Sequence, residues 1–330
     1  MLAVAIVAPK TLAQEKLPLK LVKTVTLTGY TGDFDHFAAD LKRDRMLVAA
    51  EDHATLEIFD LKSGDHLRTV TGLGAPHTIL LRPNAKEILV TDSGTQLTGA
   101  LDADTYQREG SIPLTPGVDS AGYDPVANVW YIVTGGKDVN LSTAVIEAVD
   151  PDTHKKLGEL KFNDTHVEAM ALEKHGDRLF INLAQTNRLA VVNRKTLQEI
   201  AEWPVPSAKG NAMVSFDEGA KRLYVVCRDA AMFVVMDSDT GKVISTATAP
   251  LRAGDEMMDL SAHGLYVPGG EGCIGVYDIS NPDQIQLIAK VPGAPGAKTG
   301  ILLPDLHKLV LAASPGDTGN VARILTFDLQ

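Results

Sequence analysis

Cysteine, basic charge and long apolar runs are all scarce in this chain of 330 residues. The two cysteines, Cys227 and Cys273, are too few for a structural zinc cluster, and we expect buried, unpaired thiols in preference to a disulfide. The formal net charge of -11 argues against nucleic-acid and anionic-membrane partners, because both require a basic face. No stretch approaches the roughly 20 apolar residues of a membrane-spanning helix, so we expect no membrane span.

Turn-forming and apolar residues, in contrast, are abundant. The chain has 28 Gly and 17 Pro, and 45% of its residues are hydrophobic. This composition is typical of an all-β protein with many turns and a substantial core. No break in composition marks a linker, so we predict a single domain over residues 19–330.

A short pattern recurs along the chain: an apolar run that ends in Asp or Asn, often followed by a turn of the type Asp-x-x-Thr. Successive Asp or Asn positions lie roughly 40 to 50 residues apart, the length of one four-stranded propeller blade. The side chains at these positions can bond backbone amides two residues further on. The stations are Asp60, Asp102, Asp150, Asn193, Asp237, Asp278 and Asp328. The repeat predicts a seven-bladed β-propeller with four antiparallel strands in each blade.

The two ends of the chain predict how the ring closes. The last unit stops after its third strand, and residues 19–27 (LKLVKTVTL) look like the outer strand of the other units. An open ring would leave a sheet edge unpaired. We therefore expect this N-terminal strand to pair with residues 324–327 and complete the last blade.

Residues 1–18 precede that strand. They open with an apolar run over residues 2–8 and continue to Thr11-Leu12-Ala13 before Gln14, a pattern similar to the end of a secretory signal peptide without its basic leading region. We interpret the segment as a signal-peptide remnant or a disordered tail. The first interpretation predicts a periplasmic or secreted protein.

Aligning the units on their second strands predicts the candidate site. In a propeller, the starts of the innermost strands and the loops between second and third strands share one face around the central channel. The strand starts supply His36, His77, Asp119, His166, Glu168, Asn211, Asp255, Glu256 and Lys298. The loops supply Glu51, Asp52, His53, Asp92, Asn182, Arg228 and Glu271. We expect this face to form a site for a small polar ligand or a protein partner. The ten ligand-binding candidates among these residues are His36, His77, Asp119, His166, Glu168, Asn211, Arg228, Asp255, Glu271 and Lys298.

The same side chains allow more than one chemistry. Neutral imidazoles with carboxylates suit a divalent metal such as zinc, copper, iron or manganese. A His beside a carboxylate can also do acid-base work, and Arg228 or Lys298 could hold an anionic substrate. A site without metal and a merely solvated channel are the alternatives, and no residue is singled out as a nucleophile. The candidate metal ligands are His36, His77, His166 and Glu168.

Several segments resemble one protein family. Residues 35–40 (DHFAAD), 47–52 (LVAAED) and 58–64 (IFDLKSG) look like a first blade of the YncE-like, YVTN-repeat β-propeller proteins, and residues 222–228 (RLYVVCR) and 291–299 (VPGAPGAKT) also fit. The resemblance implies a seven-bladed, periplasmic disc that is related in architecture to lactonases, to a lyase acting on a macrocyclic antibiotic, and to surface-layer repeats. The chain departs from the family because it has no intact Tyr-Val-Thr-Asn tetrapeptide, which argues against a repeat-based adhesion role.

Two classes of function remain open after the sequence analysis. The first is an exported propeller that binds a small polar ligand or a protein partner at the channel face. The second is a hydrolase or lyase that uses a metal or His/carboxylate pairs in the same pocket to act on a lactone, ester or sugar acid. The sequence leaves the identity of any cofactor and the oligomeric state open.

Overall fold

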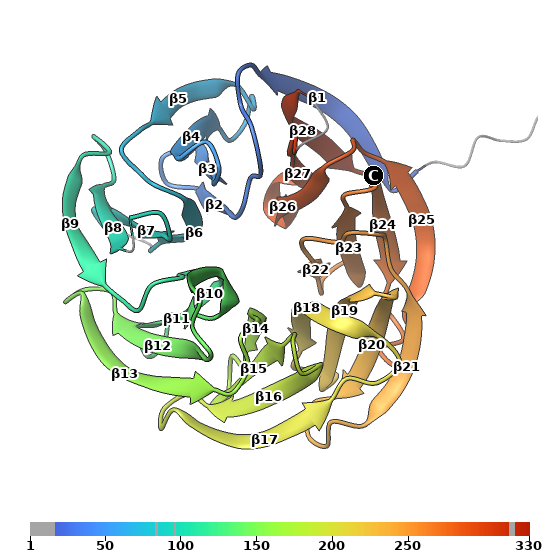
Figure 1. Ribbon diagram of the computed structural model, residues 1–330. Coiled ribbons are helices and arrows are strands. Elements are labelled where there is room, and N and C mark those ends of the chain that lie inside the picture. The colour runs from blue at the N-terminus through green and yellow to red at the C-terminus, as the bar shows by residue number, and fades with distance from the viewer. Residues whose placement is uncertain (1–16, 83–84, 96, 317–320) are drawn as a thin grey trace, which may run out of the picture.

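The computed structural model describes residues 17–82, 85–95, 97–316 and 321–330. Within these residues the strands form seven sheets of four antiparallel strands, which stand around a central channel (Figure 1). The predicted seven-bladed β-propeller is therefore confirmed. The predicted signal remnant or tail falls almost entirely on residues 1–16, which lie outside the described residues, so it stays a prediction.

Each blade is built in chain order from its innermost to its outermost strand. Blade 1 contains β2 (Phe37–Asp40), β3 (Arg45–Ala50), β4 (Thr55–Asp60) and β5 (His66–Val70). Blade 2 contains β6 (Pro76–Leu81), β7 (Glu87–Asp92), β8 (Leu97–Asp102) and β9 (Arg108–Pro113). Blade 3 contains β10 (Ala121–Asp124), β11 (Val129–Gly135), β12 (Ala144–Asp150) and β13 (Lys155–Phe162). Blades 4 and 5 contain β14 (Val167–Leu172), β15 (Arg178–Leu183), β16 (Arg188–Asn193) and β17 (Gln198–Pro204), then β18 (Lys209–Asp217), β19 (Arg222–Asp229), β20 (Ala231–Asp237) and β21 (Val243–Thr248).

Blade 6 contains β22 (Met257–Asp259), β23 (Gly264–Gly269), β24 (Cys273–Asp278) and β25 (Gln286–Pro292). Blade 7 contains β26 (Ala297–Leu303), β27 (Lys308–Ala313), β28 (Ala322–Leu329) and, from the other end of the chain, β1 (Leu19–Leu27). Two short 3₁₀ helices, η1 (Lys137–Val139) and η2 (Pro304–Leu306), lie in loops. Within the described part of the chain, no helix is long and apolar enough to cross a bilayer.

The core lies between neighbouring blades because each central strand is apolar on both faces. In β3, Met46 and Val48 pack with residues of blade 7, while Leu47 and Ala49 pack with residues of blade 2. Side chains that alternate along a strand point to opposite faces, so one strand contributes to two apolar clusters. The ring therefore buries its apolar residues between blades and leaves the polar strand starts at the channel.

Asp and Asn residues cap the turns after the third strands, as the repeat predicts. The Oδ1 atom of Asp102 accepts hydrogen bonds from the backbone N–H groups of Asp104 and Thr105, at 3.1 and 2.6 Å. The same pattern occurs at Asn193, whose Oδ1 accepts from the backbone of residues 195 and 196. The carboxylate thus holds the turn that sends the chain to the outer strand.

The N-terminal strand closes the ring on the blade that also contains the C-terminus (Figure 1). In the register of β1 against β28, Leu21 lies opposite Phe327 and Val25 lies opposite Ile324. The predicted strand exchange is therefore confirmed.

The two cysteines form no disulfide. Cys227 is buried in β19, as expected, and burial raises its pKa to about 12, which keeps the thiol protonated and unreactive. Cys273 is only partly buried, contrary to expectation, because it begins β24 at the surface, where its thiol donates to the Glu271 carboxylate.

Candidate functional site

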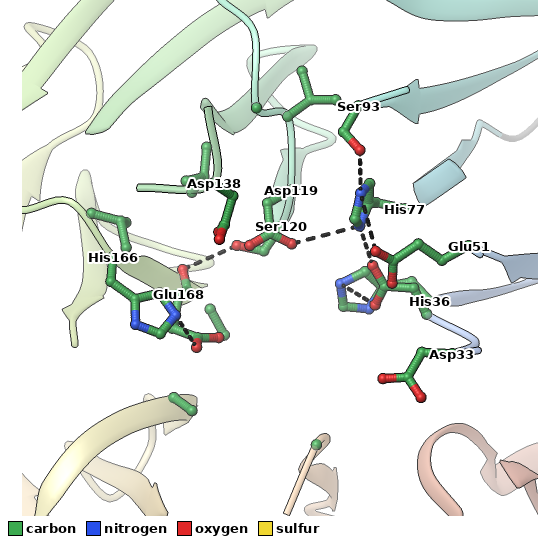
Figure 2. A pocket seen from close by; sticks show the side chains of 18 of the residues that line it. Asp33, His36, Glu51, His77, Ser93, Asp119, Ser120, Asp138, His166 and Glu168 are labelled. Carbon is green, nitrogen blue, oxygen red and sulfur yellow. Dashed lines mark hydrogen bonds and ion pairs between the residues drawn. The ribbon is translucent and has the colours of Figure 1, made fainter. Parts of the chain in front are cut away.

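A cavity of about 640 Å³ opens where the innermost strands begin, and we call it the mouth cavity. All seven blades contribute to its lining, because the starts of the innermost strands and the loops between second and third strands meet there (Figure 2). The structure places eight of the ten predicted ligand-binding residues in this lining. They are His36, His77, Asp119, His166, Glu168, Arg228, Asp255 and Lys298.

The other two predicted ligand-binding residues, Asn211 and Glu271, do not line the mouth cavity. Asn211 is fully buried, and its Nδ2 donates to Asn182 Oδ1 and to the Arg188 carbonyl, both at 2.8 Å. Glu271 accepts the backbone N–H of Leu251 at 3.1 Å. Both side chains satisfy groups within the fold, so the structure gives them structural roles.

Three further loop residues also serve the fold. The buried carboxylate of Asp92 accepts backbone N–H groups from Gly74 and Ala75, both at 2.9 Å. Asp52 accepts the backbone N–H of Asp33, and His53 stacks on the ring of Tyr30. These three side chains therefore make contacts within the fold and do not line the mouth cavity.

One side of the mouth cavity, which we call the Asp35 side, consists of Asp35, Glu51, His77 and Asp119. Figure 2 shows the last three of these side chains. His77 stands between these carboxyl groups. Its Nδ1 lies 2.6 Å from Asp35 Oδ2 and 3.8 Å from Asp119 Oδ1, and its Nε2 lies 3.9 Å from Glu51 Oε1. Its Nε2 also forms a hydrogen bond of 2.9 Å with the hydroxyl of Ser93. One imidazole thus connects groups from three blades.

Crowded negative charge shifts the acidic groups of the Asp35 side. Burial raises the pKa of Glu51 to about 7, with the charge of Asp35 adding to the rise and that of His77 opposing it. Desolvation by the channel walls raises the pKa of Asp119 to about 6, and the charge of Asp35 again contributes. These two carboxyl groups therefore hold protons at a pH where an exposed Asp or Glu is ionised.

The histidines of this region hold their protons more tightly, in spite of their burial. Desolvation lowers the pKa of His77, but the hydrogen bond and charge of Asp35 outweigh it and raise the pKa to about 9. His36 behaves alike: desolvation opposes protonation, and the charges of Asp35 and Asp255 raise the pKa overall. For Asp35, desolvation is outweighed by His36 and His77, so its pKa falls to about 2. Asp35 is the carboxylate that remains ionised.

The other side, which we call the Arg228 side, consists of His166, Glu168 and Arg228, and Lys137 contacts His166. Glu168 Oε1 lies 2.8 Å from His166 Nε2 and 2.9 Å from Arg228 Nη1. Lys137 Nζ lies 3.2 Å from His166 Nδ1, so Nδ1 accepts and Nε2 donates to Glu168. Desolvation alone would raise the pKa of Glu168, but His166 and Arg228 lower it. This carboxylate has the cationic partner that the Asp35 side lacks.

Blades 6 and 7 complete the lining with two groups that are also partnered. Lys298 Nζ donates to Asp33 Oδ2 at 2.5 Å. Asp255 accepts the backbone N–H groups of Glu256 and Gly300 at 2.8 and 3.2 Å. Because Lys298 and Arg228 are both bound to carboxylates, neither is poised for an anionic substrate as the sequence suggested.

The lining as a whole is acidic. Its carboxyl groups belong to Asp33, Asp35, Glu51, Asp119, Asp138, Glu168 and Asp255, whereas its Lys and Arg residues are Lys298 and Arg228. Both cations are taken up by ion pairs. Its histidines are His36, His77 and His166, so carboxyl groups outnumber all basic side chains of the lining by seven to five, and the cavity is acidic in composition.

The predicted metal ligands do not gather into one group. Within the described residues, one set of three or more candidate ligands has its atoms all within 4.8 Å of one another, and it is Asp35, Glu51 and His77. His166 and Glu168 pair with each other on the Arg228 side, and His36 lies beside Asp35, with Nε2 3.6 Å from Oδ1. Of the four predicted ligands, His77 alone belongs to this set.

Sequence reasoning missed Asp33 and Asp138 in the lining and, at the Asp35 side, Asp35 and Ser93. Asp35 and His36 are neighbours in the chain and both line the cavity, because the segment before β2 is not a strand and does not alternate its side chains. Ser93 follows Asp92 at the end of β7, and it reaches the cavity while Asp92 turns inward. An acid next to a predicted His, and a polar residue next to a predicted loop acid, are the signals that could have identified them.

Comparison with known proteins shows the fold alone. No protein-family model and no curated protein sequence matches the chain. A chain in the solved structure titled "Crystal Structure of Mitotic Checkpoint Complex" superposes with a TM-score of 0.75 at 12% identity, over 99% of this chain and 98% of that one. A chain of Kuenenia stuttgartiensis hydrazine synthase superposes with a TM-score of 0.74 at 13% identity, over 90% and 97% of the two chains.

Proposed function

We propose that the protein is a binding propeller whose mouth cavity takes a small polar ligand that carries positive charge. The observation that carries the proposal is the imbalance of the lining, where seven carboxyl groups face two Lys and Arg residues that are already in ion pairs. A cationic ligand gains from this field, and an anion is repelled by it. The volume of about 640 Å³ is that of a small-molecule pocket.

Thermal unfolding with small charged probes tests this proposal. Spermidine and choline are expected to raise the melting temperature of the full chain, since a ligand that binds the folded state stabilises it by mass action. Glucuronate, an anion of similar size, is expected to leave it unchanged. Asp119→Asn should reduce the shift, whereas Asp65→Asn, which alters an exposed acid on the outer strand side, should preserve it. Equal shifts for cations and glucuronate would contradict the proposal.

A second candidate function, ester or lactone hydrolysis, is favoured by one arrangement. Asp35 Oδ2 bonds Nδ1 of His77 at 2.6 Å, and Nε2 bonds Ser93 Oγ at 2.9 Å. An acid, an imidazole and a hydroxyl in this order are the parts of an activated nucleophile. Two features weigh against it: His77 is held in its protonated form, and Glu51 and Asp119 would repel the oxyanion of acyl transfer. Binding is therefore the better supported function.

Hydrolysis of p-nitrophenyl acetate and of a simple lactone tests the second candidate. If Ser93 is the nucleophile, Ser93→Ala abolishes turnover, while Ser120→Ala, which alters another hydroxyl of the lining, leaves it intact. No turnover by the unsubstituted protein, or equal turnover by both variants, would remove the hydrolase candidate.

We also propose that the protein is exported and belongs with the YncE-like, YVTN-repeat propellers. Export is supported by the apolar residues 2–8 and by Thr11-Leu12-Ala13 before Gln14. The family is supported by segments such as residues 35–40 and 222–228. Fractionation of bacteria that express the full chain tests export: a periplasmic product that lacks residues 1–13 is expected, and a cytoplasmic product of full length would contradict it.

A further inference from the structure

The Asp35 side holds a nitrogen donor among oxygen donors that arrive from separate blades. Asp35 precedes β2, Glu51 follows β3, His77 lies in β6, and Asp119 precedes β10. The ligand atoms of Asp35, Glu51 and His77 already lie within 4.8 Å of one another. A metal ion with bonds of about 2 Å requires ligand atoms about 3 Å apart, so only small side-chain movements separate this arrangement from a coordination shell.

A hydrogen bond with Ser93 fixes the orientation of the His77 ring. Ser93 Oγ forms a hydrogen bond with Nε2 at 2.9 Å, and the His77 side chain is 11% exposed. Nδ1 therefore faces Asp35 at 2.6 Å and Asp119 at 3.8 Å. A histidine that binds a metal through one nitrogen and is held by a hydrogen bond at the other has its ring position and tautomer set in advance.

Among the described residues, no lysine or arginine competes for this position. Within the described residues, no Lys or Arg forms an ion pair with Asp35, Glu51 or Asp119, although Lys298 and Arg228 line the same cavity and pair with other carboxylates. Like-charged carboxyl groups held this close repel one another unless a cation lies between them. A bound ion with two positive charges would compensate these carboxyl groups more fully than the imidazole of His77 does.

We propose that Asp35, Glu51 and His77 bind one divalent transition-metal ion in the mouth cavity, with Asp119 within reach as a further ligand. The inference deepens the proposed function, on which it rests, by naming one cationic ligand and the side of the cavity that takes it. An imidazole nitrogen with carboxylate oxygens suits manganese, iron or zinc better than calcium or magnesium, which favour oxygen ligands alone. Binding displaces the proton between His77 Nδ1 and Asp35 Oδ2.

Titration of the full chain with Mn²⁺ after dialysis against EDTA tests the site, because electron paramagnetic resonance reports the free ion directly. The expected result is one tightly bound ion per chain, with Zn²⁺ displacing it and Ca²⁺ or Mg²⁺ failing to do so at equal concentration. His77→Gln and Glu51→Gln are each expected to weaken Mn²⁺ binding at least about tenfold, because each removes a ligand. Thermal unfolding in EDTA verifies that each variant folds, and Glu51→Gln carries the test if His77→Gln does not.

Asp138→Asn is the matched control, since this carboxylate lines the same cavity outside the proposed ligand set. It should keep the affinity of the unsubstituted protein. If Asp138→Asn weakens Mn²⁺ as much as Glu51→Gln does, the cavity attracts cations only diffusely, and the inference is overturned while the proposed function stands. If Mn²⁺ does not bind but spermidine still raises the melting temperature, the metal inference alone is overturned. If neither binds, both fall.

Discussion

The Asp35 side and the Arg228 side of the mouth cavity are built from the same residue types, a histidine next to carboxyl groups, and differ in whether an arginine or lysine is present. On the Arg228 side, Glu168 contacts both His166 and Arg228, and its pKa is lowered. On the Asp35 side, Glu51 and Asp119 have no such cation among the described residues, and their pKa values rise to about 7 and about 6. The presence of Arg228 thus distinguishes the two sides: the Arg228 side is neutralised within the protein, whereas the Asp35 side can still accept a cationic ligand.

The strongest test of the comparison is to remove the one ionised carboxylate of the Asp35 side. Asp35→Asn replaces the charged partner of His77 and His36, so we expect a loss of about 2 kcal/mol in the free energy of unfolding near neutral pH, measured with urea in EDTA. Asp44→Asn, which disrupts an exposed ion pair with Lys62, should cost far less. If both variants lose the same free energy of unfolding, the contacts of Asp35 contribute no more to stability than an exposed ion pair does.

Glu256 extends the comparison to a carboxyl group deeper in the channel. Its Oε1 accepts from Ser215 Oγ at 2.7 Å, and its Oε2 has no hydrogen-bond partner among the described residues. Burial raises its pKa to about 8, so the folded state keeps a proton that the unfolded chain releases near its ordinary pKa of 4.5. The stability that it contributes is complete below that ordinary value and is lost as the pH rises through about 8.

Glu256→Gln should therefore leave stability unchanged in acid and raise it by about 1 kcal/mol near pH 9. Urea unfolding across this pH range measures the effect, with Glu109→Gln as a control at an exposed Glu of the outer strand β9. A variant that parallels the unsubstituted protein at every pH would show that Glu256 titrates normally.

Arg228→Met converts the compensated side into an uncompensated one. The substitution leaves Glu168 with His166 alone, and we expect a loss of about 1 kcal/mol, because Arg228 is itself 41% exposed and solvent replaces part of the interaction. The variant should also show a larger spermidine shift, since it adds one unpaired negative charge to the cavity. If spermidine raises the melting temperature of Arg228→Met no more than that of the unsubstituted protein, neutralisation of Glu168 by Arg228 does not limit cation binding.

The smallest effect is expected at Glu51 in the absence of metal. Glu51→Gln removes a carboxyl group whose pKa is already raised to about 7, so near pH 8 we expect a gain in stability below about 1 kcal/mol in EDTA. The same variant should lose the stabilisation that added Mn²⁺ gives the unsubstituted protein. If Glu51→Gln is instead less stable than the unsubstituted protein in EDTA, Glu51 makes a stabilising interaction within the fold and is not available for a metal ion.

The fold was accessible to sequence reasoning because its evidence is repeated. The Asp or Asn at the end of each third strand recurs at blade length, and residues 19–27 have the character of a missing outer strand. Because the pattern occurs seven times, an irregular copy does not change the predicted fold. Ring closure then follows because an unpaired sheet edge is unfavourable. Neither argument depends on where an individual side chain points.

The site depends on side-chain direction, and there the sequence is informative only in part. It locates the channel face, and His77, Asp119 and Arg228 lie there. It cannot tell that Asn211 turns to Asn182 and to the Arg188 carbonyl, because they lie on different strands and meet only through the packing of adjacent blades. It also cannot pair Arg228 with Glu168, which lie 60 residues apart and meet only through the geometry of adjacent blades.

The pairing of β1 with β28 has a consequence for how the molecule can be observed. β1 precedes all the other described strands in the chain and β28 follows them, so the ring closes only after β28 has been synthesised. Lys20 and Asp328 then lie on adjacent strands as register partners. A donor dye at one and an acceptor at the other would report the opening of this seam by energy transfer, and would show whether the disc unzips there before any blade melts.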